Sequence, residues 1–234
     1  MPLWISHRGL TEAAPENTLA AFDAAVAAGF TAVETDLRLT RDGRIVLAHD
    51  PDLSRLCGDP RRLRELDAAE VAGLRVHGHP LVFFEDFARR YADLRWTLDL
   101  KPPEAIETIA ALSRLPGAAE LVQRAIFLAW HPTHEQAVAA AFPGARFYAQ
   151  EPECRRAGAA VLFSRGIGGG IRAARTYALT ARFHGLSLFR RPVIDRYHAR
   201  GARVVAFLPE TDDDARAAVE AGVDEVLTDR RRLS

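Results

Sequence analysis

Eight short apolar runs alternate with helical patterns along the chain, and this alternation constrains the fold more than any other feature. Strands that alternate with helices build a parallel sheet, because each helix returns the chain to the edge where the next strand begins. Eight such strands predict closure into an α/β barrel of the TIM (β/α)8 type. A length of 234 residues suits one such barrel better than two domains. The expected strands are 3–7, 31–37, 95–100, 124–129, 145–149, 183–188, 203–207 and 224–227.

Helical periodicity fills most of the intervals between these runs. Asn17, which follows Pro15, is expected to cap a helix over 18–28. Residues 51–81 are irregular and contain several Pro and Gly, so we expect a small insertion above the barrel, with one helix at 66–74. We interpret residues 1–234 as a single barrel domain that includes this insertion. Further helices are expected at 83–92, 104–114, 133–141, 169–180, 190–200 and 212–221.

Polar residues gather where the first expected strands end. The first run breaks at Ser6-His7-Arg8-Gly9, and the third ends in Asp99. Glu34 and Asp36 lie two positions apart on the second run, so their side chains share one face. Active sites of such barrels lie at the carboxyl ends of the strands. We therefore expect these side chains to converge at one mouth of the barrel.

A hairpin is expected to bring a histidine to the same place. Residues 44–48 form a short extended run that ends in His49-Asp50, and Asp42-Gly43 precede it. Asp-Gly between extended runs is a strong signal for a two-residue turn. If these two residues form the turn, His49 lies directly opposite Asp36, with Cα atoms about 4.5–5.5 Å apart. The two side chains then project from the same face of the hairpin.

Lys101 stands out in the composition. The chain has one lysine and thirty arginines, and the lysine lies two positions after Asp99. Lysine is a compact point charge and arginine a planar fork, so a site built for one does not readily accept the other. We therefore expect Lys101 to have a functional role, as an unpaired cation at the rim of the pocket.

These motifs together resemble the glycerophosphodiester phosphodiesterase family. The resemblance runs from residue 5 to about residue 229, in the order and spacing of that family, and it is densest in the first fifty residues. Motifs in such number and order are a specific signal. They are His7-Arg8-Gly9, Pro15-Glu16-Asn17-Thr18, Glu34-x-Asp36, Thr40-x-Asp42-Gly43, His49-Asp50, Asp99-x-Lys101, Gly222-Val223-Asp224 and Thr228-Asp229.

The residues themselves suggest a coherent chemistry for such a site. Three carboxylates without a cysteine suit a hard divalent cation, Mg²⁺ or Ca²⁺, with water in the remaining positions. Such a metal beside Arg8 and Lys101 would make a cationic pocket for a phosphate diester. Two histidines would then supply a general base and a general acid on opposite sides of the phosphorus.

The resemblance implies the same assignment residue by residue. His7 and His49 match the catalytic histidines of the family, and Glu34, Asp36 and Asp99 match its metal ligands. Arg8 and Lys101 match its phosphate-binding residues. The implied reaction is hydrolysis of a glycerophosphodiester, a small-molecule substrate, to glycerol 3-phosphate and an alcohol.

Two positions depart from the family pattern. The family usually has Glu where this chain has Asp99, and the shorter side chain is expected to loosen the metal or to require a bridging water. Near the end, the family commonly reads Trp-Thr-Val-Asn where this chain reads Phe207-Leu208-Pro209-Glu210. Phe207 keeps an aromatic ring at the strand end, so we expect it to contact substrate. The changed neighbours bear on the alcohol side of the substrate.

Two other motifs are weaker candidates. The run from Gly166 to Gly170 is glycine-rich, but it lacks the dinucleotide-binding pattern and follows no clear strand of that kind. His131, in Trp130-His131-Pro132, follows an expected strand, so it either lines the pocket or simply precedes a helix.

The composition indicates which partners and which cellular compartment to expect. A net charge of zero and a pI of about 7.1 give no reason to expect nucleic acid or an anionic membrane surface as a partner. No apolar run approaches the length of a membrane span. The first strand starts at residue 3, which leaves no room for a signal peptide, and Cys57 and Cys154 lack metal-like spacing. We expect a cytoplasmic, reduced protein; a homo-oligomer remains open.

Three functional hypotheses follow. The first is metal-dependent hydrolysis of glycerophosphodiesters. The second is the same chemistry on lysophospholipids or inositol phosphodiesters, which an apolar lining of 51–81 would favour. The third is a barrel that binds phosphodiesters without hydrolysing them. The presence of both histidines and all three carboxylates argues against this third hypothesis.

Overall fold

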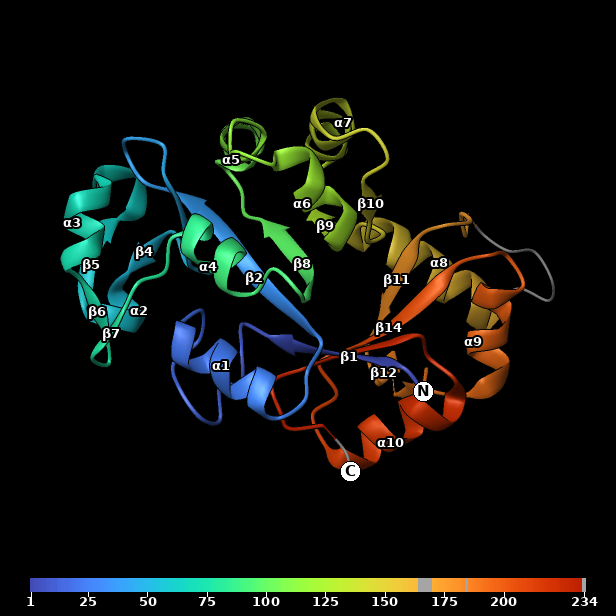
Figure 1. The fold of residues 1–234 in the computed structure, drawn as a ribbon. Coiled ribbons are helices and arrows are strands. Elements are labelled where there is room, and N and C mark those ends of the chain that lie inside the picture. Colours follow the sequence, from blue (N-terminus) through green and yellow to red (C-terminus); the bar gives the residue numbers. More distant parts are fainter. Residues whose placement is uncertain (164–169, 184, 233–234) are drawn as a thin grey trace.

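The computed structural model describes residues 1–163, 170–183 and 185–232 as a nearly closed barrel of eight parallel strands (Figure 1). The strands follow the order β10-β9-β8-β2-β1-β15-β14-β11. A bridge between Tyr148 and Thr176 brings the two ends of this path together. The predicted TIM barrel is therefore confirmed. Its strands are β1 (Leu3–His7), β2 (Ala32–Leu39), β8 (Arg95–Leu100), β9 (Ala125–Ala129), β10 (Arg146–Phe147), β11 (Thr176–Leu179), β14 (Arg203–Phe207) and β15 (Glu225–Thr228).

Helices surround the strands, and the main apolar core lies between the two layers (Figure 1). Alternate strand residues face outwards into this core, as Val33 and Trp96 do. Trp96 packs against the rings of Phe84 and Phe87, with centroids 6.0 and 5.5 Å away. The helices are α1 (Leu19–Ala27), α4 (Phe84–Arg90), α5 (Ala105–Ser113), α6 (Ala118–Arg124), α7 (Pro132–Ala141), α8 (Glu151–Phe163), α9 (Arg191–His198) and α10 (Asp212–Ala221).

The sixth barrel strand was predicted in the wrong place. The expected helix at 169–180 contains β11 instead, and its first residue lies outside the described residues. Residues on either side of position 184, which lies outside the described residues, form a small antiparallel pair of β12 (Arg182–Phe183) and β13 (Leu186–Ser187) where a barrel strand was expected at 183–188. A largely buried run of four residues has no periodicity that separates strand from helix, and the pairing of β11 with β14 decides the outcome. Residues 166–169 of the glycine-rich run also lie outside the described residues.

The segment after the second strand forms a separate small unit beside the barrel (Figure 1). Strand β3 (Ile45–Leu47) pairs antiparallel with β2 and leads into it. This small unit, the inserted unit, has an apolar core of its own, which consists of Val46, Ala48, Leu53, Leu56, Leu63, Leu66, Val71, Val76 and Leu81. Its elements are β4 (Asp52–Leu53), α2 (Ser54–Cys57), β5 (Asp59–Arg62), η1 (Leu63–Glu65), α3 (Ala68–Gly73), β6 (Arg75–Val76) and β7 (His79–Pro80).

Among the helices in the described part of the chain, none is long and apolar enough to span a membrane.

Candidate functional site

Three carboxylates meet at the carboxyl ends of adjacent strands. His7 pairs in register with Glu34 across β1 and β2, and Asp36 pairs with Asp99 across β2 and β8. One carboxylate oxygen from each of Glu34, Asp36 and Asp99 lies within 4.8 Å of the other two. All three residues are buried, at 3%, 0% and 4% exposure. Strand alternation and register therefore bring together the acidic residues that the sequence pattern singled out.

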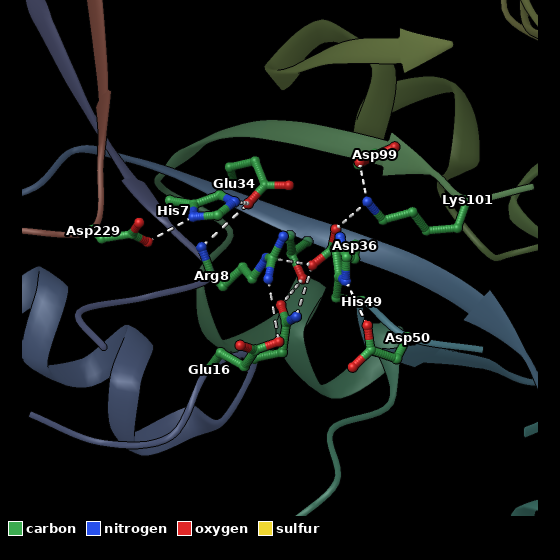
Figure 2. A network of polar contacts seen from close by, with 12 residues as sticks. His7, Arg8, Glu16, Glu34, Asp36, His49, Asp50, Asp99, Lys101 and Asp229 are labelled. Carbon is green, nitrogen blue, oxygen red and sulfur yellow. Dashed lines mark hydrogen bonds and ion pairs between the residues drawn. The ribbon is translucent and has the colours of Figure 1, made fainter. Parts of the chain in front are cut away.

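Two cations lie against these carboxylates (Figure 2). Lys101 Nζ is 2.6 Å from Asp99 Oδ2 and 2.9 Å from Asp36 Oδ1, and Arg8 Nε is 3.0 Å from Asp36 Oδ2. Lys101 is only 6% exposed, so the expectation of an unpaired lysine at the pocket rim is wrong. Burial lowers the pKa of the Lys101 ammonium, but the charges of Asp99 and Asp36 outweigh burial and raise it overall. Lys101 is therefore a charged member of the cluster.

The two cations do not neutralise the three acids equally. Burial would raise the pKa of Asp36, but the charges of Lys101 and Arg8 outweigh it and hold that pKa below its usual value. Burial raises the pKa of Asp99 in spite of the Lys101 charge. Burial, together with the charges of Asp36 and Asp99, raises the pKa of Glu34 well above its usual value. The cluster thus lacks positive charge when all three carboxylates are ionised.

This electrostatic imbalance fits a divalent cation. Three carboxylates carry one more negative charge than the two cations in contact with them, Lys101 and Arg8, can neutralise. Carboxylate oxygens without cysteine or histidine nitrogen in the set are the donors that Mg²⁺ and Ca²⁺ prefer. A divalent cation would also favour the ionised form of Glu34. Glu34, Asp36 and Asp99 are therefore suited to hold such an ion.

Each predicted histidine is oriented by a carboxylate. His7 Nδ1 lies 2.6 Å from Asp229 Oδ1, which leaves Nε2 facing Glu34 Oε2 at 3.7 Å. His49 Nδ1 lies 2.7 Å from Asp50 Oδ1. A carboxylate on one ring nitrogen fixes the tautomer and directs the other nitrogen to its partner. Both rings are therefore held as a general acid or base requires.

The predicted hairpin register is wrong by one residue. The ladder pairs Leu37 with Leu47 and Leu39 with Ile45, so Ala48, whose N–H donates to the Asp36 carbonyl at 3.1 Å, takes the place expected for His49. The turn has three residues, because Thr40 N–H donates to the Arg44 carbonyl at 2.9 Å across it. Gly43 at its end has φ 82°, the left-handed conformation that closes such loops.

His49 nevertheless joins the network of the site (Figure 2). Strand β3 ends at Leu47, so the face of the ladder does not decide where His49 points. The Arg38 guanidinium donates to the His49 carbonyl at 2.9 and 2.8 Å. Arg38 comes from β2, so the strand that carries Glu34 and Asp36 also fixes the backbone of His49.

Asn17 belongs to the site, although its expected role was to cap a helix. Thr18 is the actual N-cap, since its side chain accepts from the Ala21 N–H. Asn17 is 2% exposed, and its Nδ2 donates to Asp36 Oδ2 at 2.9 Å while its Oδ1 accepts from Thr35 Oγ1 at 2.8 Å. Its φ of 56° is a left-handed conformation that asparagine tolerates. The Pro-Glu-Asn motif thus positions the Asp36 carboxylate of the acidic cluster.

Trp130 was not predicted as a site residue. Its Nε1–H donates to Asp99 Oδ1 at 2.6 Å, and its ring lies 5.4 Å from Lys101 Nζ. Both oxygens of Asp99 are thus engaged, one by Trp130 and one by Lys101, which fixes the orientation of its short side chain. The neighbouring His131 caps α7 by accepting from the Thr133 N–H at 3.3 Å, so the helix-start reading of His131 holds.

The remaining predicted residue, Phe207, lies apart from this network. It is half-buried at the end of β14, two strands from β1 in the barrel order, and packs against the apolar cluster that includes Leu227.

On the other side of the site, Arg55 from the inserted unit donates to Asp50 at 2.6 Å and to Glu16 at 2.8 Å. The rim facing the inserted unit is therefore charged, and most of the large apolar residues of that unit are buried in its own core.

Comparison with known proteins agrees with this arrangement. A family model described as the glycerophosphoryl diester phosphodiesterase family matches residues 7–233. A relative named as probable glycerophosphodiester phosphodiesterase 2, from Mycobacterium tuberculosis, is 27% identical over 98% of this chain and 88% of its own length.

Solved structures agree in fold. The glycerophosphoryl diester phosphodiesterase domain of an uncharacterized M. tuberculosis protein superposes with a TM-score of 0.85 at 20% identity, over 98% of this chain and 96% of that one. An Oleispira antarctica phosphodiesterase, solved in complex with the product sn-glycerol-3-phosphate, gives 0.74 at 22% identity, over 99% and 94%.

Proposed function

Because the chain belongs to the glycerophosphoryl diester phosphodiesterase family, as its motifs predicted, we propose that it hydrolyses glycerophosphodiesters to sn-glycerol 3-phosphate and an alcohol. One observation carries the proposal. Three carboxylates within 4.8 Å of one another, two cations and two carboxylate-oriented histidines meet at the carboxyl mouth of the barrel. That set provides charge for a phosphate diester and two groups that transfer protons.

We assign a divalent cation, Mg²⁺ or Ca²⁺, to Glu34, Asp36 and Asp99. When bound, it would supply positive charge to the phosphate oxygens of the substrate. Arg8 and Lys101 border the same carboxylates and would bind the phosphate through charge-assisted hydrogen bonds. We keep Phe207 as a contact for the alcohol side, since it lies at a strand end of the same mouth.

The proton transfers fall to the two histidines. His7 and His49 would act as the acid and base pair, one activating water and the other protonating the leaving alcohol. Asp229 and Asp50 hold one ring nitrogen of each, so the second nitrogen is the one available for the reaction. Asp229 and Asp50 are therefore positioning residues in this proposal.

The setting of the reaction is proposed with it. We take residues 1–234 as one catalytic domain, because the core of the inserted unit includes Val46 from β3 and Ala48 just after it. The free thiols of Cys57 and Cys154 suit a reducing, cytoplasmic location. The charged rim around Arg55 favours a small polar substrate over a lysophospholipid.

A substrate panel tests the function. Purified protein would be assayed with glycerophosphocholine, glycerophosphoethanolamine, glycerophosphoinositol and a lysophospholipid, with release of glycerol 3-phosphate as the readout. We expect turnover of at least one glycerophosphodiester, loss of turnover in EDTA, and recovery with Mg²⁺ or Ca²⁺. Full activity after exhaustive EDTA treatment would refute metal dependence. Tight binding of every diester without turnover would instead identify a binding protein.

Lys101→Met should impair catalysis even with saturating metal. A charge-assisted hydrogen bond is worth about 1.5–3 kcal/mol, so kcat/KM should fall by about 10- to 150-fold. The matched control is Arg89→Met, which removes an exposed cation paired with Asp86 on α4 and should leave kcat/KM unchanged. If Lys101→Met turned over like the wild type in saturating metal, its ammonium would not contact phosphate.

A further inference from the structure

A second cavity opens at the opposite mouth of the barrel, where the strands begin. It has a volume of about 120 Å³. Its lining includes the first residue of seven of the eight barrel strands, among them Arg95, Arg146, Arg203 and Glu225. The acidic cluster lies at the other ends of these strands. Ile5, Val205 and Leu227 form part of an apolar cluster between the two ends, so the second cavity is separate from the first site.

Four arginines line this cavity: Arg95, Arg124, Arg146 and Arg203. Arg95, Arg146 and Arg203 each begin a strand and lie an even number of positions from a residue that faces the barrel interior, as Arg95 does from Asp99, while Arg124 ends α6 just before β9. All four are exposed, so water reaches their guanidinium groups. The chain as a whole carries 31 basic and 31 acidic residues, so four arginines around one cavity are a local excess of positive charge.

Only part of this charge is neutralised. Arg203 lies 3.2 Å from Glu225, the one carboxylate among the described residues of the lining, and the second oxygen of Glu225 accepts from the Tyr148 hydroxyl at 2.9 Å. Arg124 donates to the carbonyl of Ala92. Arg95 and Arg146 have no side-chain hydrogen bond or ion pair within the described ranges 1–163, 170–183 and 185–232. Two guanidinium forks are therefore available for a ligand.

We propose that this mouth binds a small phosphate-bearing anion, at a site distinct from the catalytic one. Guanidinium groups bind phosphate through paired N–H donors, and a cavity with several of them at its rim holds an anion from more than one side. Residues at this mouth of such barrels usually serve stability. Arginines that only kept the rim soluble would need neither a cavity beside them nor positions that face the barrel interior. The volume limits the buried part of the ligand to about one phosphate group.

Calorimetric titration with inorganic phosphate and with pyrophosphate tests this site. Both titrations use the 234-residue protein carrying Lys101→Met, in EDTA, so that binding at the catalytic mouth is weakened in every sample. The added variant is Arg95→Gln/Arg146→Gln, and the matched control is Arg89→Gln/Arg216→Gln, two exposed arginines on helices. Sodium chloride at equal ionic strength controls for general screening.

We expect saturable binding in the Lys101→Met protein and in the control, and at least about tenfold weaker binding in the Arg95→Gln/Arg146→Gln protein. Arg146→Gln alone, which removes one exposed guanidinium, serves in case the double change disturbs folding, and it should weaken binding in the same direction. The proposal would be overturned if Arg95→Gln/Arg146→Gln and Arg146→Gln both kept an unchanged affinity for phosphate and pyrophosphate. It would also be overturned if sodium chloride at equal ionic strength gave the same titration response as these anions. In the protein with Lys101 intact, the double change should leave turnover of glycerophosphodiesters unchanged, which separates this site from the catalytic one.

Discussion

His7→Ala and His49→Ala are each expected to lower kcat by about 10²- to 10⁴-fold while leaving metal affinity nearly unchanged. Neither ring is assigned to the metal: His7 Nε2 lies 3.7 Å from Glu34 Oε2, and His49 pairs with Asp50. A group that only transfers a proton affects the chemical step and not the binding of the cation. Single-turnover rates and metal titrations of the same preparations separate the two effects.

The chain offers a matched control for these changes. His198 also pairs with a carboxylate, with Nε2 2.9 Å from Asp224 Oδ2, but it lies near the start of β15, at the opposite mouth from the acidic cluster. His198→Ala should therefore keep full turnover. Loss of metal binding in His7→Ala or His49→Ala would move that histidine into the coordination sphere. It would also end its assignment as acid or base.

Asp229→Asn tests the orienting role of the carboxylates. The amide keeps the size of the side chain but removes the charge that holds His7 Nδ1. We expect kcat to fall by less than in His7→Ala and KM to change little, because the ring remains and only its tautomer is less well fixed. A KM effect without a kcat effect would place Asp229 in substrate binding instead.

Much of the mouth that holds the acidic cluster was predictable because it depends on local rules. The bounds of β8 and β14 match the expected strands, and side-chain alternation alone puts Glu34 and Asp36 on one face. Asp99 joins them because the carboxyl ends of parallel strands meet at one edge. The barrel fold thus follows from periodicity, and the three carboxylates follow from the barrel.

Contacts between distant parts of the chain were not predictable in this way. Asn17 obeys the local pattern of a helix cap, yet its side chain is used by Asp36 and Thr35, which no local rule reveals. Trp130 reaches Asp99 from the next strand along the barrel, and Asp229 reaches His7 from the other end of the chain. Such partners depend on barrel closure, which brings β15 beside β1.

The predicted register of the hairpin was wrong, yet His49 lies at the site where it was expected. Asp42-Gly43 do form part of the turn, but the loop holds three residues, and the ladder is shifted by one position. A shift of one position reverses the face of every residue on the ladder. His49 escapes that consequence because it lies beyond the last ladder residue, Leu47. Its position depends on Arg38 and Asp50, not on the register.

Glu34→Gln is expected to abolish metal-dependent turnover and to stabilise the metal-free protein. Burial and the charges of Asp36 and Asp99 raise the Glu34 pKa well above 4.5, its ordinary value. The fold therefore disfavours ionised Glu34 in the absence of metal, and glutamine resembles the protonated form. The glutamine oxygen can still accept from the backbone N–H of Arg8, whose nitrogen lies 3.2 Å from Glu34 Oε2. The variant thus loses a buried charge and keeps the hydrogen bond.

The sign of the pH dependence follows from the raised pKa. Below the unfolded-state pKa, Glu34 is protonated in both states and contributes its full stability to the fold. That contribution is lost as the pH rises through the raised folded-state pKa. In EDTA, the advantage of Glu34→Gln over the wild type should therefore be absent in acid and grow towards neutral pH. A gain of about 1 kcal/mol would raise the Tm by about 2–4 °C.

Added metal should reverse the order of stability. A ligand that binds only the folded state stabilises it in proportion to the logarithm of its concentration over its Kd, so the wild type should gain Tm with added Mg²⁺ or Ca²⁺. Glu34→Gln lacks one of the three carboxylates and should gain little. Glu107→Gln, at an exposed position on α5, should behave as the wild type does in both buffers. If Glu34→Gln proved less stable than the wild type in EDTA at neutral pH, the buried carboxylate would be a net contributor to the fold. The electrostatic reason for placing a cation beside it would then fail.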